Sequence, residues 1–442
     1  MKTLIAVSIA VMISSTALAQ TKELSFDSIW SQVRNQSPAL QSSELQTEAT
    51  LESQSRASRH WLPKVYLDAR SYRTNDPGNS FFGLLEQRSL KQTDFNPDTI
   101  NHPDAQTYTR GALGIDLALY EGGMKSTQVG LLKHAVAAQE NTRHQTEVEQ
   151  YSMVGLSYGS IGILKEQIKS LQSVNIELSR LIKNYQLGSK ANPVGYSGLL
   201  GMKALANRIS GLINQYEAQS KAYYQTLQEL GIKDLPWTPR KIETEKFLQK
   251  YFVSSTTAQV SAPSFKVEAM KASAKMSEQA ADMEKAKFLP RIGAFAESFV
   301  FNGHRDTADG YSAGLYLQWS LFDPNHYGSL KEAKLKSMAT AKYSEAIAQQ
   351  ERAEHAALSA SYEALRANTA LLKDSYALLM EQSKMSQTLF KNGSINALQI
   401  VEILNRQTDL ITQQLEAELG LLKVGVERIT KQKFEIGVQN EN

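Results

Sequence analysis

The chain has 442 residues, with 48 lysines and arginines against 45 aspartates and glutamates, and no cysteine. A net charge of +3 with both signs interleaved excludes the basic footprint of a nucleic-acid-binding protein, and the absence of cysteine excludes disulfides, thiolate metal sites and a lipidated cysteine. The seven histidines have no ligand spacing such as i, i+4, so we expect no metal site and no cofactor.

Residues 1–19 have the pattern of a secretory signal peptide. Lys2 precedes an apolar run from Leu4 to Ile13, and Ala17-Leu18-Ala19 has the A-x-A form of a cleavage site. A helix that crosses a membrane needs about 20 apolar residues, which this run does not reach. We therefore expect export of the chain.

The first half of the chain is predicted to begin with a helix over residues 25–60, which ends at Leu-Pro-Lys (62–64). Residues 65–72 then alternate between apolar and polar side chains, and this period of two predicts a strand. A polar loop is expected over residues 73–106. The strand that follows the loop also alternates, and its apolar side chains share one face: Leu113, Ile115, Leu117 and Leu119.

Amphipathic segments of about ten residues with aromatic residues at their ends are typical of transmembrane β-barrels. Tyr108 and Tyr120 lie near the two ends of the second strand. For one strand alone, an amphipathic strand of a soluble sandwich is the simpler explanation. The number of such strands and their arrangement must decide between the two structures.

A long helix is predicted between Gly123 and Gly188, followed by a turn and a returning helix to about Leu230. A proline-containing linker over residues 232–262 separates the two halves. The second half repeats the order of the first, because a helix leads to Leu-Pro-Arg (289–291) and a strand over 292–301. The next strand has its apolar side chains on one face, including Leu315, Leu317 and Trp319.

Residues 329–392 contain neither glycine nor proline, which predicts a second long helix that turns at Gly393 and Ser394 into a last helix. Seven of its residues follow one another at alternating steps of four and three, a mean period of 3.5 that favours left-handed supercoiling against a partner helix. We expect packing in a ring or layer of helices; the alternative is an ordinary long coiled coil. The seven residues are Leu358, Tyr362, Leu365, Thr369, Leu372, Tyr376 and Leu379.

The chain therefore reads as one unit written twice, and the predicted organisation has five parts. These are a signal peptide (1–19), a first repeat (20–231) with a β-hairpin at 62–121, a linker (232–262), a second repeat (263–433) with a β-hairpin at 289–322, and a mobile polar tail (434–442).

The two hairpins supply four strands, each about long enough to cross a bilayer at a tilt. Four strands cannot close a barrel that pairs every backbone group in lipid. Closure requires several copies of the chain around a symmetry axis, and three copies give twelve strands. The predicted fold is thus an α+β membrane protein in which a trimeric 12-stranded β-barrel is continued by a long α-helical coiled-coil tube.

Several short motifs recur in a fixed order. They are Leu62-Pro63-Lys64 and Leu289-Pro290-Arg291 where a helix leads into a strand, Leu119-Tyr120-Glu121-Gly122-Gly123 and Leu321-Phe322-Asp323 where a strand leads into a helix, and Leu389-Phe390-Lys391-Asn392-Gly393-Ser394 at the last turn. Through their order, spacing and duplication, the chain resembles the TolC-type outer-membrane efflux proteins along nearly its whole length.

This resemblance implies a homotrimeric channel in the outer membrane that extends into the periplasm. It implies the exit duct of a tripartite efflux or type I secretion system, which docks with a periplasmic adaptor (membrane fusion) protein and an inner-membrane transporter of the RND or ABC type. Lipid of the outer membrane would contact the apolar strand faces. The cargo stays open among drugs, metal ions and polypeptides.

The resemblance also implies a periplasmic gate near the helix turns at Gly188 and at Gly393-Ser394. In that family, acidic residues six and nine positions after the second turn glycine form rings around the pore. Here those positions are Gln399 and Glu402, so the resemblance implies one carboxylate ring, which would favour cations. The alternative is that Glu402 is a solvated helix charge. The family's arginine two positions after the turn glycine is replaced by Ile395.

Next to the first turn, Gly195, Gly198 and Gly201 recur every three residues, which predicts either a flexible strip on a gate helix or close packing alone. Residues 310–314 fit the nucleophile pattern G-x-S-x-G, but Ser312 is followed by further alternating strand rather than by a helix. We therefore expect no enzyme. The rival hypothesis is a periplasmic coiled-coil adaptor or an envelope-spanning structural protein, which would leave the four amphipathic strands unexplained.

Overall fold

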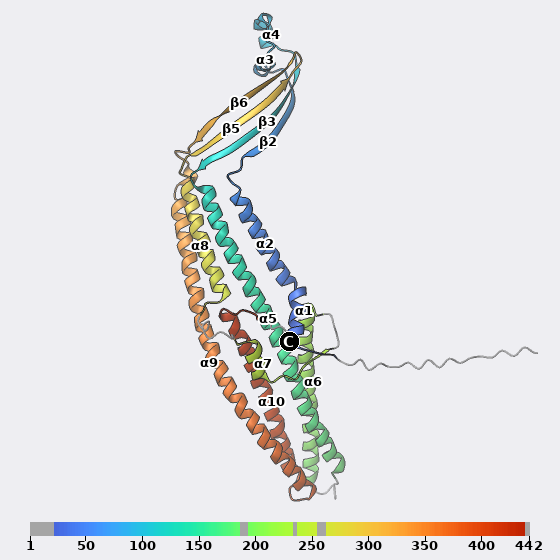
Figure 1. The fold of residues 1–442 in the computed structure, drawn as a ribbon. Helices are drawn as coiled ribbons and strands as arrows, with labels where there is room; N and C mark the ends of the chain where they lie inside the picture. Colours follow the sequence, from blue (N-terminus) through green and yellow to red (C-terminus); the bar gives the residue numbers. More distant parts are fainter. Residues whose placement is uncertain (1–21, 186–192, 233–236, 254–261, 438–442) are drawn as a thin grey trace, which may run out of the picture. The chain divides into compact units, whose positions relative to one another are not determined.

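The computed structural model describes residues 22–185, 193–232, 237–253 and 262–437, which divide into two compact units (Figure 1). The first unit takes its residues from 1–41, 145–264 and 352–442, and the second from 42–144 and 265–351. Each unit therefore contains segments of both predicted repeats. The predicted signal peptide and Gly188 lie outside the described residues.

Both halves of the chain have the order helix, antiparallel hairpin, long helix, returning helix (Figure 1). In the first half the elements are β1 (Lys22–Leu24), α1 (Phe26–Gln36), α2 (Pro38–Ser58), β2 (Lys64–Thr74), α3 (Pro77–Glu86), η1 (Gln92–Phe95), α4 (Pro97–Asn101), β3 (Gln106–Glu121), α5 (Met124–Asn184) and α6 (Pro193–Glu229). In the second half they are β4 (Trp237–Pro239), α7 (Thr244–Tyr251), α8 (Phe265–Ala286), β5 (Arg291–Asn302), β6 (Thr307–Gln318), η3 (Pro324–His326), α9 (Ser329–Lys391), α10 (Ala397–Arg428) and η4 (Ile429–Lys431).

The long helix predicted over residues 329–392 is confirmed by the 63 residues of α9. Gly328, with φ +83°, takes a backbone conformation that favours glycine and sets the start of this helix. Tyr362 and Thr369 of the predicted seam are buried, and the other five seam residues are half-buried, as the period of 3.5 requires. Within the described ranges, no helix is both long enough and apolar enough to span a membrane.

The single helix predicted over residues 25–60 is wrong, because the chain breaks between α1 and α2 at Ser37. Pro38 disfavours a helical conformation at the residue before it, and Ser37 is accordingly extended, with φ −65° and ψ 119°. Ser25 caps α1, since its hydroxyl oxygen accepts a hydrogen bond from the Ser28 amide at 3.3 Å.

The polar loop predicted over residues 73–106 is also wrong, because it contains α3, η1 and α4. Asp76 begins α3: its carboxylate accepts the Asn79 amide at 2.8 Å, and Pro77 occupies the first turn, where no amide hydrogen is needed. Asn96 and Pro97 begin α4 in the same way. We call residues 77–101 the cap.

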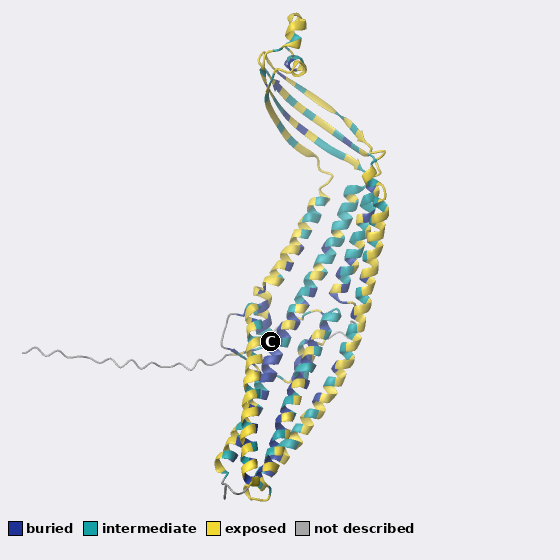
Figure 2. Cartoon of the chain, turned by 180° about the vertical axis from the view of Figure 1, so that it is seen from behind, coloured by how far each residue is buried: buried dark blue, intermediate teal, exposed yellow. Residues whose placement is uncertain are grey.

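In the described part of the chain, β2, β3, β5 and β6 form a four-stranded antiparallel sheet in that order. The register is continuous except for a bulge at Leu119 in β3, between the paired residues Ala118 and Tyr120. Figure 2 shows the alternation of burial along these strands. The predicted pair of hairpins is thus confirmed as one sheet of the second unit.

The first unit has its core around an aromatic cluster from α1, α5 and α7. The Phe26 ring lies 5.2 Å from the Tyr151 ring and 5.3 Å from the Phe247 ring, both edge-on. Burial raises the pKa of the Tyr158 hydroxyl, in the same cluster, to about 12. Phe434, the first residue of the predicted mobile tail, is buried here and belongs to the packed structure.

Candidate functional site

One face of the sheet exposes aliphatic side chains. Leu67 of β2 pairs across the sheet with Leu113 of β3, and Leu67 is 78 % exposed. Leu315 of β6 belongs to the same face and is 75 % exposed. A contiguous apolar patch of this kind marks an interaction surface. We call this surface the aliphatic face: Val65, Leu67, Leu113, Ile115, Leu117, Val300, Leu315 and Leu317.

The structure brings five of the seven residues predicted to face lipid onto this surface: Leu113, Ile115, Leu117, Leu315 and Leu317. The other two depart from the strand pattern. Leu119 is the extra residue of the β3 bulge, and Trp319 follows the end of β6. The Trp319 indole nitrogen donates a hydrogen bond to the Phe288 carbonyl at 3.1 Å, which fixes the ring beside the helix-to-strand junction.

The opposite face of the sheet carries charges and aromatic rings. Arg110 of β3 forms an ion pair with Glu297 of β5, and the Tyr66 hydroxyl donates to the same carboxylate at 3.2 Å. The Tyr316 hydroxyl donates to Asp116 at 3.4 Å. Charged groups that bond to one another and to hydroxyls suit a surface in contact with water. We call this surface the polar-aromatic face.

Four aromatic rings of the polar-aromatic face lie across glycines of the neighbouring strand. A Cβ atom on Gly114 would lie 2.3 Å from the Tyr66 ring, and one on Gly293 would lie 2.3 Å from the Tyr316 ring. Each ring therefore lies across the neighbouring strand. The cross-strand pairs are Tyr66–Gly114, Phe295–Gly314, Phe299–Gly310 and Tyr316–Gly293.

The edge strands β2 and β6 each pair on one side only within the described residues. The other side of each presents backbone N–H and C=O groups without a strand partner. An edge that is long and flanked by an exposed aliphatic face is a template for pairing with another strand.

The cap packs on the loop end of the polar-aromatic face. Tyr108 of that face is 1 % exposed, its ring meets Gly83 of α3, and its hydroxyl donates to the Ser80 carbonyl at 3.4 Å. Phe301 is buried as well, whereas Thr109 and Asp309 on the aliphatic side of the same end are exposed. The cap thus covers one face and leaves the other bare.

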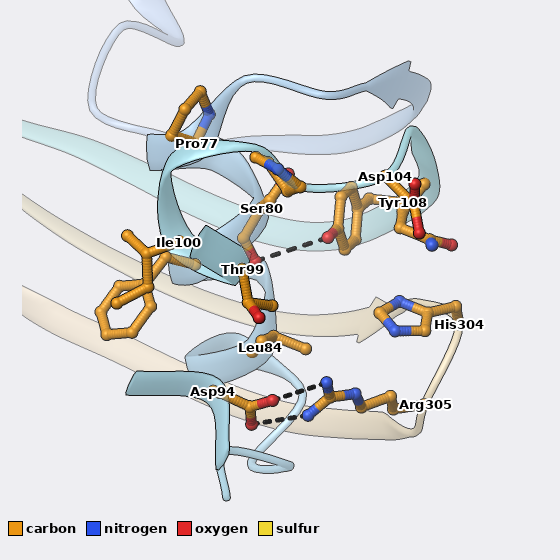
Figure 3. Close-up of a pocket in the computed structure, with 13 residues that line it drawn as sticks. Pro77, Ser80, Leu84, Asp94, Thr99, Ile100, Asp104, Tyr108, His304 and Arg305 are labelled. Atoms are coloured by element: carbon orange, nitrogen blue, oxygen red, sulfur yellow. Dashed lines mark hydrogen bonds and ion pairs between the residues drawn. The ribbon is translucent and has the colours of Figure 1, made fainter. Parts of the chain in front are cut away.

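An ion pair holds the cap to the turn between β5 and β6 (Figure 3). The Arg305 guanidinium donates to both carboxylate oxygens of Asp94 at 2.7 Å, and Asp94 is only 4 % exposed. These bonds, with one from the Lys91 amide, lower the pKa of Asp94 to about 2. Beside them the Gln87 side-chain oxygen accepts from the Arg305 amide at 2.9 Å. We call Asp94, Arg305 and Gln87 the latch.

A cavity of about 180 Å³ lies between the cap and the sheet (Figure 3). Phe81, Leu84 and Ile100 form its apolar wall, and Ser80, Tyr108 and His304 contribute polar groups. Burial and the nearby Arg305 lower the pKa of His304, so its imidazole is neutral at neutral pH. The Ser80 hydroxyl is buried and has no hydrogen-bond partner among the described residues.

The predicted turn at Gly393 and Ser394 is present at the end of α9. Gly393 has φ +74°, and the Ser394 amide donates to the Leu389 carbonyl at 2.8 Å, which closes the helix with a glycine in the left-handed region. Near this turn a cavity of about 480 Å³ is lined by residues from the ends of α5, α6, α9 and α10, including Tyr185, Val194 and Ile395.

The two predicted gate residues lie in the first two turns of α10 but make different contacts. The Gln399 side chain accepts from the Asn396 amide at 2.9 Å, and the Asn396 side chain accepts from the Gln399 amide at 3.0 Å, a reciprocal capping box. Glu402 is exposed and accepts from Arg406 at 2.9 Å in the same helix. Gln399 therefore starts the helix, a role that the sequence analysis missed.

The glycine strip predicted next to the first turn lies on α6. A Cβ atom on Gly198 would lie 2.3 Å from the Ala397 Cβ atom, at the start of α10. Gly195 is buried, and Gly201 faces Val401. The strip brings α6 close to the helix that carries Gln399 and Glu402.

Ser312, the serine of the G-x-S-x-G pattern, lies within β6 and is exposed, so it has no strand-to-helix turn around it. No group of three or more His, Asp or Glu residues in the described part of the chain could hold a metal ion.

The fold matches solved bacterial channels. A crystal structure of CusC, in a study of transmembrane channel formation, matches with a TM-score of 0.75 at 10 % identity, over 93 % of this chain and 92 % of that one. The Campylobacter jejuni CmeC outer membrane channel matches with 0.73 at 12 % identity, over 92 % and 85 %. The open state of the Neisseria gonorrhoeae MtrE outer membrane channel matches with 0.71 at 12 % identity, over 92 % and 88 %.

No protein-family model matches the sequence, and neither does any curated protein. The likeness to the solved structures shows that this chain has the fold of these channels and confirms the predicted α+β fold, with long helices and four antiparallel strands in the described residues.

Proposed function

We propose that this chain, which has the fold of these channels, is one subunit of a homotrimeric outer-membrane channel. It acts as the passive exit duct of a tripartite efflux or type I secretion system and extends into the periplasm. The proposal rests on the four-stranded sheet. Its aliphatic face suits contact with lipid, its polar-aromatic face suits contact with water, and its edge strands β2 and β6 have no strand partner on their outer sides within the described residues.

Trimerisation follows from the unpaired edges. In lipid, an edge strand has no water to bond with its backbone groups, so β6 of one copy must pair with β2 of the next. The strands of three copies make a closed barrel, with every backbone group paired and every aliphatic face outward. A second copy-to-copy surface is the exposed stripe on α9 that repeats every seven residues: Ala357, Ala364, Leu371, Leu378 and Met385.

The partners are a periplasmic adaptor protein and an inner-membrane transporter, because a passive duct needs both an energy source and a seal against the periplasm. The cavity near Gly393 at the helix ends offers the adaptor a concave surface with both polar and apolar side chains, in which the Tyr185 and Phe390 rings are stacked 5.9 Å apart. At the start of α10, Glu402 lines the gate and favours cations.

The test is the mass of the detergent-extracted protein, taken from a separated outer-membrane fraction, followed by its conductance in a planar bilayer. A trimer that forms ohmic or gated pores supports the proposal. A monomer or dimer from the soluble periplasmic fraction, without conductance, contradicts it and favours the periplasmic adaptor. Leu315→Asp on the aliphatic face should abolish membrane assembly, whereas the matched Ser312→Asp on the opposite face of the same strand should not.

A further inference from the structure

We propose that the cap forms a second, outer constriction of the pore, in which three copies of α3 and η1 meet inside the mouth of the barrel. This inference rests on the proposed trimeric channel. This constriction is separate from the proposed gate at Glu402. It is formed by residues 77–101, which were predicted to be part of a polar loop.

The first step is the side of the sheet that the cap covers. Tyr108 and Phe301 alternate with residues of the aliphatic face and therefore belong to the polar-aromatic face. The cap packs on Tyr108, and the Phe301 ring, 5.7 Å from the Tyr108 ring, is buried beside it, whereas the aliphatic side of the same end stays exposed. If the aliphatic face contacts lipid, the cap lies on the inside of the barrel wall.

The second step is the surface that the cap turns away from the sheet. Ser80 and Gly83 are buried on the side of α3 that meets the sheet, and Gln87, the residue after α3, is buried as well. Phe82 projects about 200° around the helix from Ser80, at 100° per residue, and is 63 % exposed. Phe95 of η1 is 57 % exposed. In a closed barrel the side opposite the wall faces the axis, so these rings point into the pore.

The third step is the size of the mouth. Twelve strands about 4.8 Å apart and tilted by about 40° give a barrel with a backbone diameter of about 24 Å. A helix with its side chains is about 10 Å wide. Three caps against the wall therefore reach the axis, and the surfaces that meet there are the exposed Phe82, Leu85 and Phe95 of each copy.

The fourth step is what holds the constriction. Large apolar side chains exposed on the cap gain burial when three copies of the cap meet, and a ring of apolar side chains in a narrow pore excludes ions by dewetting. The latch fixes each cap to the β5–β6 turn, because Arg305 binds Asp94. A further bond, from the Arg88 guanidinium to the Asp309 carbonyl at 2.7 Å, joins the end of the cap helix to β6, so that the rings keep their place. The occupant of the apolar cap surface is thus a second copy of this chain.

The absence of cysteine from the sequence allows a direct test of proximity. Phe82→Cys trimers, oxidised with copper phenanthroline and oxygen, should give a disulfide between two subunits on a non-reducing gel. Val300→Cys is the matched control, because Val300 is exposed on the aliphatic face near the same end of the sheet and should stay uncrosslinked.

Conductance tests the constriction itself. The double variant Phe82→Ser, Phe95→Ser should at least double the single-channel conductance of the wild-type trimer, and Val300→Ser should leave it unchanged. A conducting trimer in which Phe82→Cys does not crosslink, or in which the double serine variant conducts like wild type, overturns the outer constriction and leaves the channel intact. A wild-type protein that forms neither trimer nor pore overturns the proposed function instead.

Discussion

Asp94 is the residue on which the position of the cap depends. Its carboxylate is buried, accepts both arms of the Arg305 guanidinium and has a pKa of about 2, below the ordinary value of 3.8. A carboxyl group whose pKa is lowered in the folded state contributes stability above its ordinary pKa and loses that contribution as the pH falls toward the lowered value. The latch should therefore be intact at pH 5 and weaken between about pH 4 and pH 2.

Asp94→Asn should loosen the cap at every pH above about 4, where the wild-type carboxyl is ionised, because a neutral amide cannot form an ion pair with Arg305. The free energy of local opening should fall by about 1.5–3 kcal/mol, the range for hydrogen bonds to charged groups. Hydrogen exchange of residues 77–101 measures this opening. Asp98→Asn, in the exposed part of α4, is the matched control and should exchange like wild type. Equal protection in Asp94→Asn and wild type at pH 7 would contradict the assigned role of the latch.

Substitutions of Glu402 and Arg406 should change the cation preference of the pore in opposite directions. If Glu402 lines the gate, Glu402→Ala should reduce the preference of the pore for cations, since the carboxylate ring is lost. Arg406→Ala should increase the preference, because it removes the cation that lies 2.9 Å from that carboxylate. The reversal potential in a salt gradient reports both changes. Two shifts of the same sign, or none, would mean that Glu402 is a solvated helix charge.

At the scale of elements, the glycine–aromatic pairs decide how the strands pack. Gly114→Ala should destabilise the sheet by about 1–3 kcal/mol, because the new methyl group would overlap the Tyr66 ring. Gly111→Ala in the same strand has open space around its Cβ atom and should be neutral or slightly stabilising. The temperature at which the trimer dissociates in detergent compares the two variants. Similar temperatures for both would show that the Tyr66 ring moves aside at little cost.

The sequence was sufficient to predict those elements whose pattern is local. Residues 329–392 lack glycine and proline and keep a period of 3.5, so α9 could be predicted within one or two residues of its ends. The alternation around Leu113 and Leu315 likewise predicted strands that expose one aliphatic face. In each case the physical cause, a helix or pleat period, acts between neighbours in the chain.

The cap and the latch could not be predicted in this way. Asp76-Pro77-Gly78-Asn79 is typical of a turn and equally of a helix start, and packing of Gly83 on Tyr108 selects the helix. Asp94 and Arg305 are 211 residues apart, so no local pattern joins them. The capping role of Gln399, in contrast, could have been predicted from the sequence. Asn-x-x-Gln ahead of an apolar helix is the pattern of a capping box, but Gln399 was considered only as a possible pore residue.

At the scale of the whole molecule, the exposed α9 stripe should contribute to trimer stability. Leu371→Ser combined with Leu378→Ser should lower the fraction of trimer at a given detergent concentration, because the apolar contact between copies is lost. Lys384→Ser is also exposed on α9 but lies off the stripe, and it should leave the fraction unchanged. Light scattering measures the mass of both. An unchanged trimer in the double variant would place the copy-to-copy contact elsewhere.

The capping box at the start of α10 has an evolutionary consequence. Residue 399 can be glutamate as readily as glutamine, because either side chain can accept the Asn396 amide. Gln399→Glu therefore keeps both hydrogen bonds of the capping box at the start of α10. The codons of the two amino acids differ by a single base. In a trimer, that one substitution would add a carboxylate to every subunit at once. If Gln399 lies at the proposed gate, the charge of that gate can change by one substitution while the start of α10 keeps its hydrogen bonds.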